Sequence, residues 1–379
     1  MITLYQLDQS GNTKVWKTYL IENDNYTTIV TESGRLNGKM IKTEINITEG
    51  KNVGKANETT HYTQAYSEAK SKISLKLREG YTEDLNSAKK SAVLGSGIPS
   101  PMLAQKHSPD GSQSSSKTLK QIGILEKQIV VQPKLDGNRC LIVVTDGVPS
   151  MYTRKGDLMP VQLTHVLMDV KNKLNENENI ILDGELFSNE ISFNTLNGLI
   201  KRSTVTKEDE EKRLKIKYHL YDTVMDSGYE IRMELIARFA SENIMVVPSY
   251  TIIATDDLIK RYLEMFLSEG HEGLMIRQLG IPYENKRTWQ LCKVKVFEDK
   301  EFKLIGFEED VRGGFVGAFV MLGEDGNSFN AGASGQSVEE RTEMWNNQNR
   351  YVGKMATVEF FGRSEYNVPR FPKFKGIRE

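Results

Sequence analysis

The sequence predicts an α+β protein built from several domains, and three observations lead to this prediction. The chain has 379 residues, whereas one domain usually contains ~100 to 200. Its hydrophobic pattern changes from the two-residue period of strands to the period of helices and back again. A Ser-, Gly- and Pro-rich stretch at residues 86–118 separates two such patterned regions, as expected of a connector.

Residues 1–84 are predicted to form a small module of strands and one helix. Four runs alternate apolar and polar positions between turn signals: ITLYQL, KVWKTYLI, YTTIVT and MIKTEINI. From Thr63 to Leu77 the apolar positions recur every four residues, which predicts an amphipathic helix that ends near Gly80. The module is therefore an antiparallel sheet with a helix.

The rest of the chain divides by the same criteria. Residues 85–120 are the connector and the start of the next unit, with one short packed piece at PMLA, residues 101–104. Residues 121–297 alternate strand-like runs with helical stretches at 161–174 and 256–268, which predicts antiparallel sheets with helices. Residues 298–379 are rich in strands and glycine, which predicts a small β-barrel of the oligonucleotide-binding type.

Composition excludes several classes of protein. With 38% hydrophobic and 27% charged residues, the chain lacks the run of ~20 apolar residues that crosses a membrane. The first residues resemble neither a signal peptide nor a transit peptide, so we expect a cytoplasmic protein. The two cysteines, Cys140 and Cys292, are far apart in apolar runs, which predicts buried thiols and excludes a disulfide framework.

Charge is spread unevenly around a net value of −1. Residues 85–120 carry 5 Lys and Arg against 1 acidic residue, residues 121–349 carry 27 against 36, and residues 350–379 carry 7 against 3. Basic flanks around an acidic middle are weakly indicative of phosphate backbones outside and metal-binding carboxylates inside.

The sharpest chemical signals lie at strand ends. Lys134 ends an apolar strand in KLDGNR, where Gly137 permits close approach of a ligand. Taken alone, this pattern also fits a β-hairpin with a solvated lysine.

Other charged residues lie on apolar strands. Asp183 and Glu185 share a face of LDGELF, Glu272 begins EGLMIR, and Lys293 and Lys295 share a face of LCKVKVF. Edge-strand charge explains each motif separately. Together they predict a site for a nucleotide phosphate and a divalent metal, because clustered charges of one sign need a counter-ion.

Six strings occur in the order of the nucleotidyltransferase motifs of ATP-dependent DNA ligases: KLDGNR (134–139), TRKG (153–156), LDGELF (182–187), YHLYD (218–222), EGLMIR (272–277) and KVK (293–295). The chain resembles this family over residues 101–379, and in particular the compact ligases of DNA phages. The tail strings RGGFVGAF, GASGQSVEERTEMW and PRFPKFKGIR are similar to the family's oligonucleotide-binding domain and favour DNA ligases over messenger RNA capping enzymes.

The resemblance implies three chemical steps on nicked duplex DNA. Lys134 would attack the α-phosphorus of ATP, releasing pyrophosphate and forming a lysyl-adenylate. The AMP would move to the 5′-phosphate of the nick, and the 3′-hydroxyl would displace it. The expected protein is a monomeric enzyme; an RNA ligase and a nick-binding protein without activity are the alternatives.

The resemblance also assigns residues around the nucleotide. Lys293 and Lys295 would act catalytically with Lys134 by holding the α-phosphate. Arg139 and Arg154 would contact the nucleotide and then the nick phosphate.

Three further residues complete the implied nucleotide site. Gln132 would read the adenine edge, and Tyr221 would stack on adenine where Phe is frequent in the family. Glu185 would bind ribose hydroxyls or metal.

Glu272 would help to hold Mg²⁺ (or Mn²⁺). The motif that begins at Thr153 commonly has Ser there, and both residues offer a hydroxyl. The tail lacks a strict R-x-D-K string, so Arg370, Lys373 and Lys375 are all open as the cation that orients pyrophosphate; Arg370 and Lys373 are also candidate DNA contacts.

The first module resembles a WGR domain through VWKTYLI, SGRLNGKM and the helix that follows. Ser33 stands in place of the signature Trp, before Gly34 and Arg35. The resemblance implies a DNA contact through Arg35, while a module that merely packs on the catalytic unit is the alternative.

Overall fold

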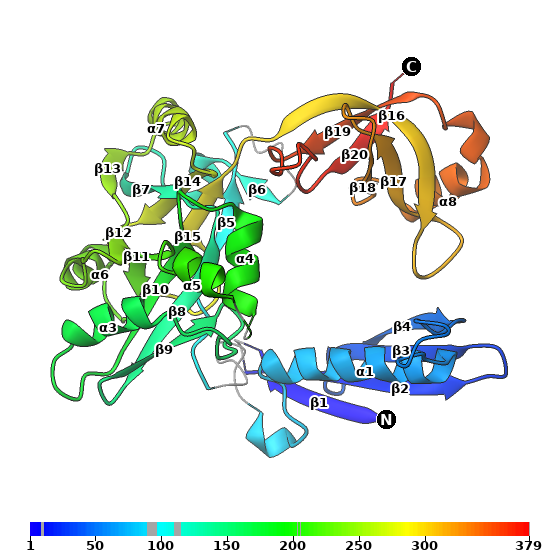
Figure 1. The fold of residues 1–379 in the computed structure, drawn as a ribbon, viewed down its shortest axis with the longest axis horizontal. Helices are drawn as coiled ribbons and strands as arrows, with labels where there is room; N and C mark the ends of the chain where they lie inside the picture. Colours follow the sequence, from blue (N-terminus) through cyan, green and yellow to red (C-terminus); the bar gives the residue numbers. More distant parts are fainter. Residues whose placement is uncertain (9–10, 89–96, 110–114, 203, 205, 379) are drawn as a thin grey trace.

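The computed structural model describes residues 1–8, 11–88, 97–109, 115–202, 204 and 206–378. These residues form a four-stranded sheet, a five-stranded sheet, a six-stranded sheet and a closed barrel. Figure 1 shows a C-shaped molecule in which the two larger sheets form one side. The N-terminal sheet and the barrel extend from that side as two arms.

The N-terminal sheet is an antiparallel meander with one helix packed on it, as the sequence predicts. Its elements are β1 (Ile2–Leu7), β2 (Thr13–Glu22), β3 (Thr27–Arg35), β4 (Met40–Ile47) and α1 (His61–Arg78). Ala65 and Ala69 of α1 pack against Ile29 of β3. A capping box at Thr60 precedes the helix, which begins two residues before the predicted start. The 3₁₀ turn η1 (Leu85–Ser87) follows.

The five-stranded sheet has helices on one face. Its strand order is β12 (Ile244–Val246), β11 (Lys217–Thr223), β10 (Ile180–Phe187), β8 (Asn138–Thr145) and β9 (Val148–Thr153). The helices that follow its strands are α3 (Thr164–Asn172), α4 (Phe193–Lys201), α5 (Lys207–Arg213) and α6 (Tyr229–Ala237). Alternate residues of β8, such as Ile142, pack with Val166 of α3 and Leu199 of α4. Arg139 lies on the opposite face of β8 and lines a cavity.

The six-stranded sheet carries the strand that ends in Lys134. Its order is β13 (Tyr250–Ile253), β7 (Gln128–Lys134), β14 (Gly273–Gln278), β15 (Arg287–Val294), β5 (Leu103–His107) and β6 (Ser116–Lys117). The accompanying helices are α2 (Leu119–Ile122) and α7 (Asp256–Ser268), the latter with the predicted bounds. Ile129 and Val131 of β7 pack with Phe266 of α7, so one face of β7 is fixed in a core.

The prediction of antiparallel sheets is wrong for part of residues 121–297, where the sheets are mixed. β11 pairs with β12, β15 with β5, and β5 with β6, all in parallel. A parallel pair requires a crossover connection, and α6 supplies it between β11 and β12. A second difference concerns the lysine pair, because β15 ends at Val294 and Lys295 lies just beyond it.

The last part of the chain forms a closed five-stranded barrel. It contains β16 (Glu298–Glu309), β17 (Val316–Leu322), β18 (Ser328–Gly332), β19 (Met355–Phe360) and β20 (Lys373–Ile377), with α8 (Val338–Asn346) and the 3₁₀ turn η2 (Gln348–Arg350). Phe319 and Phe374 stack inside it with ring centroids 3.8 Å apart. Two of the strings that suggested the ligase tail lie on β17 and α8.

Two sequence-based expectations concern single features. Cys140 and Cys292 are buried free thiols, as predicted, and burial raises the pKa of Cys292 to about 12. The packed piece at PMLA is confirmed by Met102, which is 3% exposed and whose backbone N–H donates to the Tyr283 hydroxyl. Parts of the predicted connector, residues 89–96 and 110–114, lie outside the described residues.

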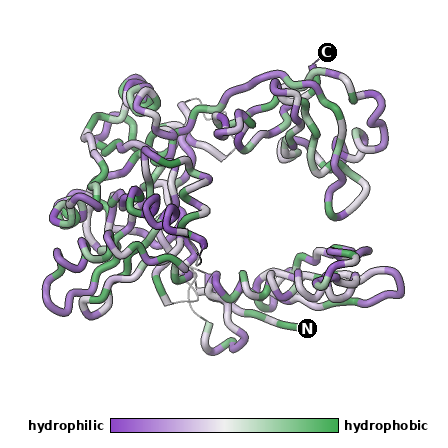
Figure 2. The backbone as a smooth tube through the Cα atoms, in the orientation of Figure 1, coloured by the Kyte–Doolittle hydropathy of each residue, from purple (hydrophilic) through white to green (hydrophobic). Residues whose placement is uncertain are grey.

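Hydrophobic and hydrophilic segments alternate along the described backbone (Figure 2). Within the described part of the chain, no helix combines the length and apolar character that crossing a membrane requires.

Candidate active site

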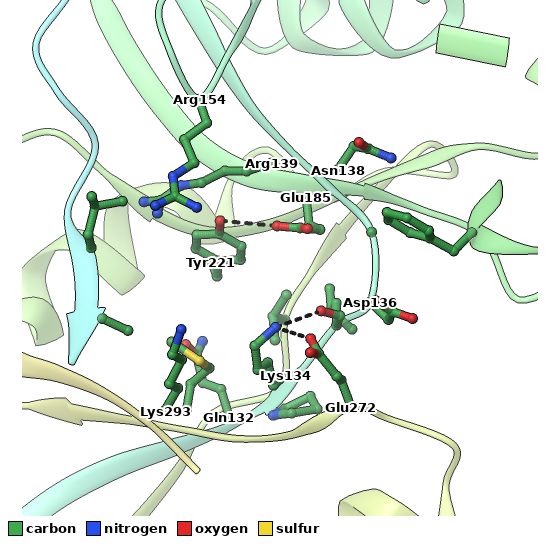
Figure 3. Close-up of a pocket in the computed structure, with 18 of the residues that line it drawn as sticks. Gln132, Lys134, Asp136, Asn138, Arg139, Arg154, Glu185, Tyr221, Glu272 and Lys293 are labelled. Carbon is green, nitrogen blue, oxygen red and sulfur yellow. Dashed lines mark hydrogen bonds and ion pairs between the residues drawn. The ribbon is translucent and has the colours of Figure 1, made fainter. Parts of the chain in front are cut away.

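A cavity of about 580 Å³ lies between the two larger sheets. Figure 3 shows two facing walls, with Arg139, Arg154, Glu185 and Tyr221 on one and Gln132, Lys134, Glu272 and Lys293 on the other. Ten predicted site residues line this cavity: Gln132, Lys134, Arg139, Arg154, Glu185, Tyr221, Glu272, Lys293, Lys295 and Arg370. The tertiary structure thus brings together residues spread over more than 230 positions of sequence.

Lys134 is the last residue of β7, and its amine points into the cavity (Figure 3). The loop after it passes close to β10, because a Cβ on Gly137 would lie 2.3 Å from the Leu186 carbonyl oxygen. Only glycine allows this approach. Burial lowers the pKa of Lys134, while the nearby carboxylates of Glu185 and Asp136 act in the opposite direction.

Glu272 joins the two lysines of this wall. Its carboxylate forms ion pairs with both Lys134 and Lys295 while its side chain is only 5% exposed. The chain directly after it passes close to β15, since a Cβ on Gly273 would lie 2.3 Å from the Val294 carbonyl oxygen. Burial and the adjacent Lys134 charge lower the pKa of Lys295 to about 8. Both amines are therefore easier to deprotonate than ordinary lysines.

The opposite wall holds Arg139 in a fixed position. Its Nε and Nη2 atoms donate to the two carboxylate oxygens of Asp183 at 2.9 and 2.5 Å. The Tyr283 hydroxyl donates to the same carboxylate at 2.6 Å. Asp183 thus satisfies the guanidinium while leaving it beside the cavity.

Glu185 lies next to Tyr221 on the same wall. The Tyr221 hydroxyl donates to the Gly184 carbonyl at 3.3 Å and lies 3.5 Å from Glu185 Oε2. Burial raises the pKa of Glu185 to about 7, against the opposing effects of Lys134 and Arg139. A carboxyl group with this pKa is ready to exchange a proton or to bind a cation near neutral pH.

Three further cations line the cavity. In the described part of the chain, neither Arg154 nor Lys293 forms a salt bridge, and Arg287 donates to the Ala104 carbonyl at 2.5 Å. Burial, and then the Lys134 charge, lowers the pKa of Lys293. Unpaired cations gathered in one cavity favour binding of a polyanion.

Gln132 is 1% exposed, and both ends of its amide are hydrogen-bonded. Oε1 accepts from Arg277 Nε at 2.6 Å, and Nε2 donates to Ser249 Oγ at 2.9 Å. Arg277 also donates to Asp222, which pairs with Arg232 as well. The sequence reasoning missed this network, although Arg277 ends the EGLMIR string and Asp222 ends YHLYD.

Arg370 is the one predicted tail cation among the residues lining the cavity. It reaches from the barrel part of the chain and donates to the Asp136 carboxylate at 2.5 and 3.0 Å. Beside it, Asn194 donates to Glu365 at 3.1 Å. These contacts join the segment after β19 to the Lys134 loop and to α4.

The other predicted nucleic-acid contacts lie elsewhere. Lys373 and Lys375 pair with Glu359 at 3.5 and 3.1 Å and line a different hollow. The side chain of Arg35, at the end of β3, is 67% exposed, and its Nη2 atom lies 3.4 Å from Asp8 Oδ2.

A divalent metal would have to rely on few protein ligands. Among the described residues, no group of three His, Cys, Asp or Glu side chains could hold a metal ion. Mg²⁺ commonly uses one or two carboxylates together with substrate phosphates and water. Glu185 and Glu272 suit that mode of binding, because they face the same cavity as the unpaired cations, which would bind the phosphates of the substrate.

A lysine amine, clustered cations and two carboxylates in one cavity define a pocket in which a lysine can react with an anionic ligand. The chain belongs to the family described as ATP dependent DNA ligase domain, whose model matches residues 101–295. A second model, described as DNA ligase OB-like domain, matches residues 311–378. The fold is accordingly the nucleotidyltransferase plus OB-like arrangement of these ligases, with mixed sheets and helices.

Individual relatives agree with this family. The DNA ligase of African swine fever virus (isolate Tick/South Africa/Pretoriuskop Pr4/1996) is 25% identical over 300 residues, which cover 73% of this chain and 64% of the viral protein. The chain thus matches less than two thirds of that relative's length. A solved structure named Pmar-Lig_PreS3 has a TM-score of 0.61 at 23% identity, covering 74% of this chain and 68% of its own. A structure from work on DNA binding with a minimal scaffold by Lig E DNA ligases has a TM-score of 0.57 at 22% identity, covering 74% of this chain and all of its own.

Proposed function

We propose that this chain is an ATP-dependent DNA ligase that seals nicks bearing a 5′-phosphate and a 3′-hydroxyl in duplex DNA. One observation carries the proposal: Lys134 ends β7 in a cavity shared by Lys293, Lys295, Glu185 and Tyr221. Nucleotidyl transfer needs an amine of lowered pKa next to cations that bind phosphate, and this cavity supplies both.

In the first step, neutral Lys134 Nζ attacks the α-phosphorus of ATP. A nitrogen–phosphorus bond forms while the bond to the pyrophosphate oxygen breaks. The proton that the amine gives up can pass to Glu272, whose carboxylate contacts Nζ. Lys293 and Lys295 would stabilise the negative charge that develops on the α-phosphate.

The remaining steps use the same groups. AMP passes from Lys134 to the 5′-phosphate of the nick, and the 3′-hydroxyl then attacks that phosphate and releases AMP. Arg139 and Arg154 would hold the nucleotide and afterwards the nick phosphate, and Tyr221 would stack on adenine. A divalent cation, Mg²⁺ or Mn²⁺, would be held by Glu185 and Glu272 and would neutralise phosphate charge.

We assign the leaving pyrophosphate to Arg370 rather than to Lys373 or Lys375. Arg370 reaches the cavity, whereas the other two are paired with Glu359. Its present partner, Asp136, would have to release it to the phosphates.

The domain assignment belongs to the same proposal. Residues 1–84 would be a WGR-like module that touches DNA through Arg35, and residues 85–120 a connector. Residues 121–297 would carry adenylation and residues 298–379 the OB-fold domain. The enzyme would act as a monomer in the cytoplasm, as a compact ligase of the phage type.

Two measurements test the proposal. Incubation with α-labelled ATP should label the protein covalently, and subsequent addition of nicked DNA should release the label and yield sealed strands. Sealing of nicked RNA in preference to DNA would favour the RNA ligase alternative. Absence of label would favour a nick-binding protein without activity.

A further inference from the structure

The amide of Gln132 has only one orientation open to it. A glutamine amide has an acceptor oxygen and a donor nitrogen on one plane, and turning it over exchanges the two. An arginine side chain can only donate, and Arg277 Nε lies 2.6 Å from the amide, so the oxygen must face it. The nitrogen then donates to Ser249 Oγ, whose own hydroxyl donates to the Val247 carbonyl at 3.2 Å.

Arg277 is itself unable to move away. It is 4% exposed, and its Nη1 donates at 2.5 Å to Asp222, which is fully buried. Asp222 also accepts from Arg232 Nε at 2.6 Å. This chain of contacts links β11 of one sheet to β14 and β7 of the other, so the orientation of Gln132 is fixed by the packing of two sheets.

The geometry points to Arg277 and Ser249 as positioning residues that select the purine of the nucleotide through Gln132. Adenine presents an amino donor beside a ring-nitrogen acceptor, whereas guanine presents a carbonyl acceptor beside a ring N–H donor. A glutamine amide that can turn over satisfies either base. A fixed amide offers its acceptor and donor in one order and therefore matches only one of them, which is adenine in an ATP-dependent protein.

This inference rests on the proposed function, because it needs a nucleotide in the Lys134 cavity with its base at Gln132. Gln132 and Val247 both line that cavity, and so does Arg277. Guanine would place its carbonyl oxygen against the amide oxygen and its ring N–H against the amide nitrogen, so neither hydrogen bond to the base could form.

The test is the ratio of kcat/KM for covalent labelling by α-labelled ATP and by α-labelled GTP. Ser249→Ala removes the acceptor for Nε2 at a residue that is exposed, so the fold should survive. We expect the ATP-to-GTP ratio to fall about three- to tenfold, the size of one hydrogen bond. Ser249→Thr keeps the hydroxyl and should restore the ratio.

Arg277→Lys should lower the ratio by about tenfold or more, because Arg277 sets the position of the oxygen. Because Arg277 is buried, the thermal unfolding of the Arg277→Lys variant is compared with that of the wild-type protein. If this variant does not fold, Ser249→Ala remains the test. Gln132→Glu provides a matched background, because a carboxylate is unchanged when turned over. In that background, Ser249→Ala should leave the ratio unaltered.

The outcomes separate the two levels of inference. If the wild-type protein takes up no label from ATP, the proposed function is wrong, and so is this inference. Wild-type labelling with ATP, but an unchanged ratio in both Ser249→Ala and Arg277→Lys, overturns the positioning role alone. A ratio that falls equally in the Gln132→Glu background also overturns it, since the effect would not pass through the amide.

Discussion

Two carboxylates of the two larger sheets and their loops each lie between two cations, yet their surroundings differ. Glu272 pairs with Lys134 and Lys295, whose side chains are 21% and 20% exposed. Asp222 pairs with Arg232 and Arg277, whose side chains are 3% and 5% exposed. Arginine stays charged at any ordinary pH, whereas a buried lysine can lose its proton.

The different surroundings of Glu272 and Asp222 suggest different roles, one chemical and one structural. The cations around Glu272 reach a cavity and have lowered pKa values, so this cluster can exchange a proton and meet a ligand. The cations around Asp222 are almost completely buried, and their hydrogen bonds to Asp222 connect two sheets. The same charge pattern is therefore expected to give a reactive group in one place and a rigid support in the other.

The largest effect should come from Lys134→Ala, which removes the only amine at the end of β7. We expect loss of covalent labelling by ATP with thermal unfolding close to that of wild type. Lys134→Arg should fail as well, because a guanidinium stays protonated and cannot act as a nucleophile. A labelled alanine variant would show that another residue is the nucleophile.

Asp222→Asn should cost about 3–5 kcal/mol of stability, because two buried guanidinium groups lose their negative partner. Glu272→Gln is the matched control and should cost less, since its lysines can turn towards the cavity. Urea unfolding of both variants measures the difference. Equal losses would mean that burial does not distinguish the two clusters.

Lys293→Ala and Lys295→Ala should each slow adenylation about 10² to 10³-fold while weakening ATP binding less. The physical reason is that these cations would stabilise the negative charge that develops on the α-phosphate during the transfer. Single-turnover labelling gives the rate, and equilibrium titration gives the affinity. Normal rates in both variants would make these lysines edge-strand charge.

A pH effect on stability should arise at His219, which packs edge-on against the Phe187 ring at 5.2 Å. Burial lowers its pKa to about 4 from the usual 6.5, so the unfolded chain binds a proton that the native protein does not. Stability should therefore fall as pH drops from 6.5 towards 4. His219→Gln should flatten the unfolding temperature over that range, and an unchanged slope would contradict the assignment.

The smallest effect should come from an exposed pair, Arg35–Asp8. Arg35→Ala should weaken binding to nicked duplex DNA a few-fold at low salt, and less at high salt, because phosphate contacts are screened. Lys51→Ala is a suitable control, since Lys51 is 66% exposed and pairs with Glu68 at the same 3.4 Å. Equal affinities in all three proteins at low salt would leave the module without a DNA contact.

Much of the fold follows from local pattern. The alternation in residues 1–47 predicts the four strands, and the four-residue spacing predicts α1. Helix α6 was missed because its sequence, YEIRMELIA, has no clear apolar stripe. Without that helix, the parallel pairing of β11 with β12 could not be foreseen, since a crossover decides it.

The candidate site could be predicted only in part from the sequence. Lys134, Glu272 and Lys293 were recognisable because charged residues at the ends of apolar strands are unusual. Arg370 could not be placed, since its contact with Asp136 spans 234 positions and depends on where the barrel part lies.

The sequence by itself determined the family and predicts the kind of chemistry, because six short motifs occur in the family's order and supply the amine, the cations and the carboxylates. Only the tertiary structure decided what each charge can do. Burial and partners set proton affinity and mobility, and both depend on residues far apart in the chain. We expect Lys134 to be reactive because β7 ends in a cavity, whereas Arg277 is held in place because two sheets enclose it.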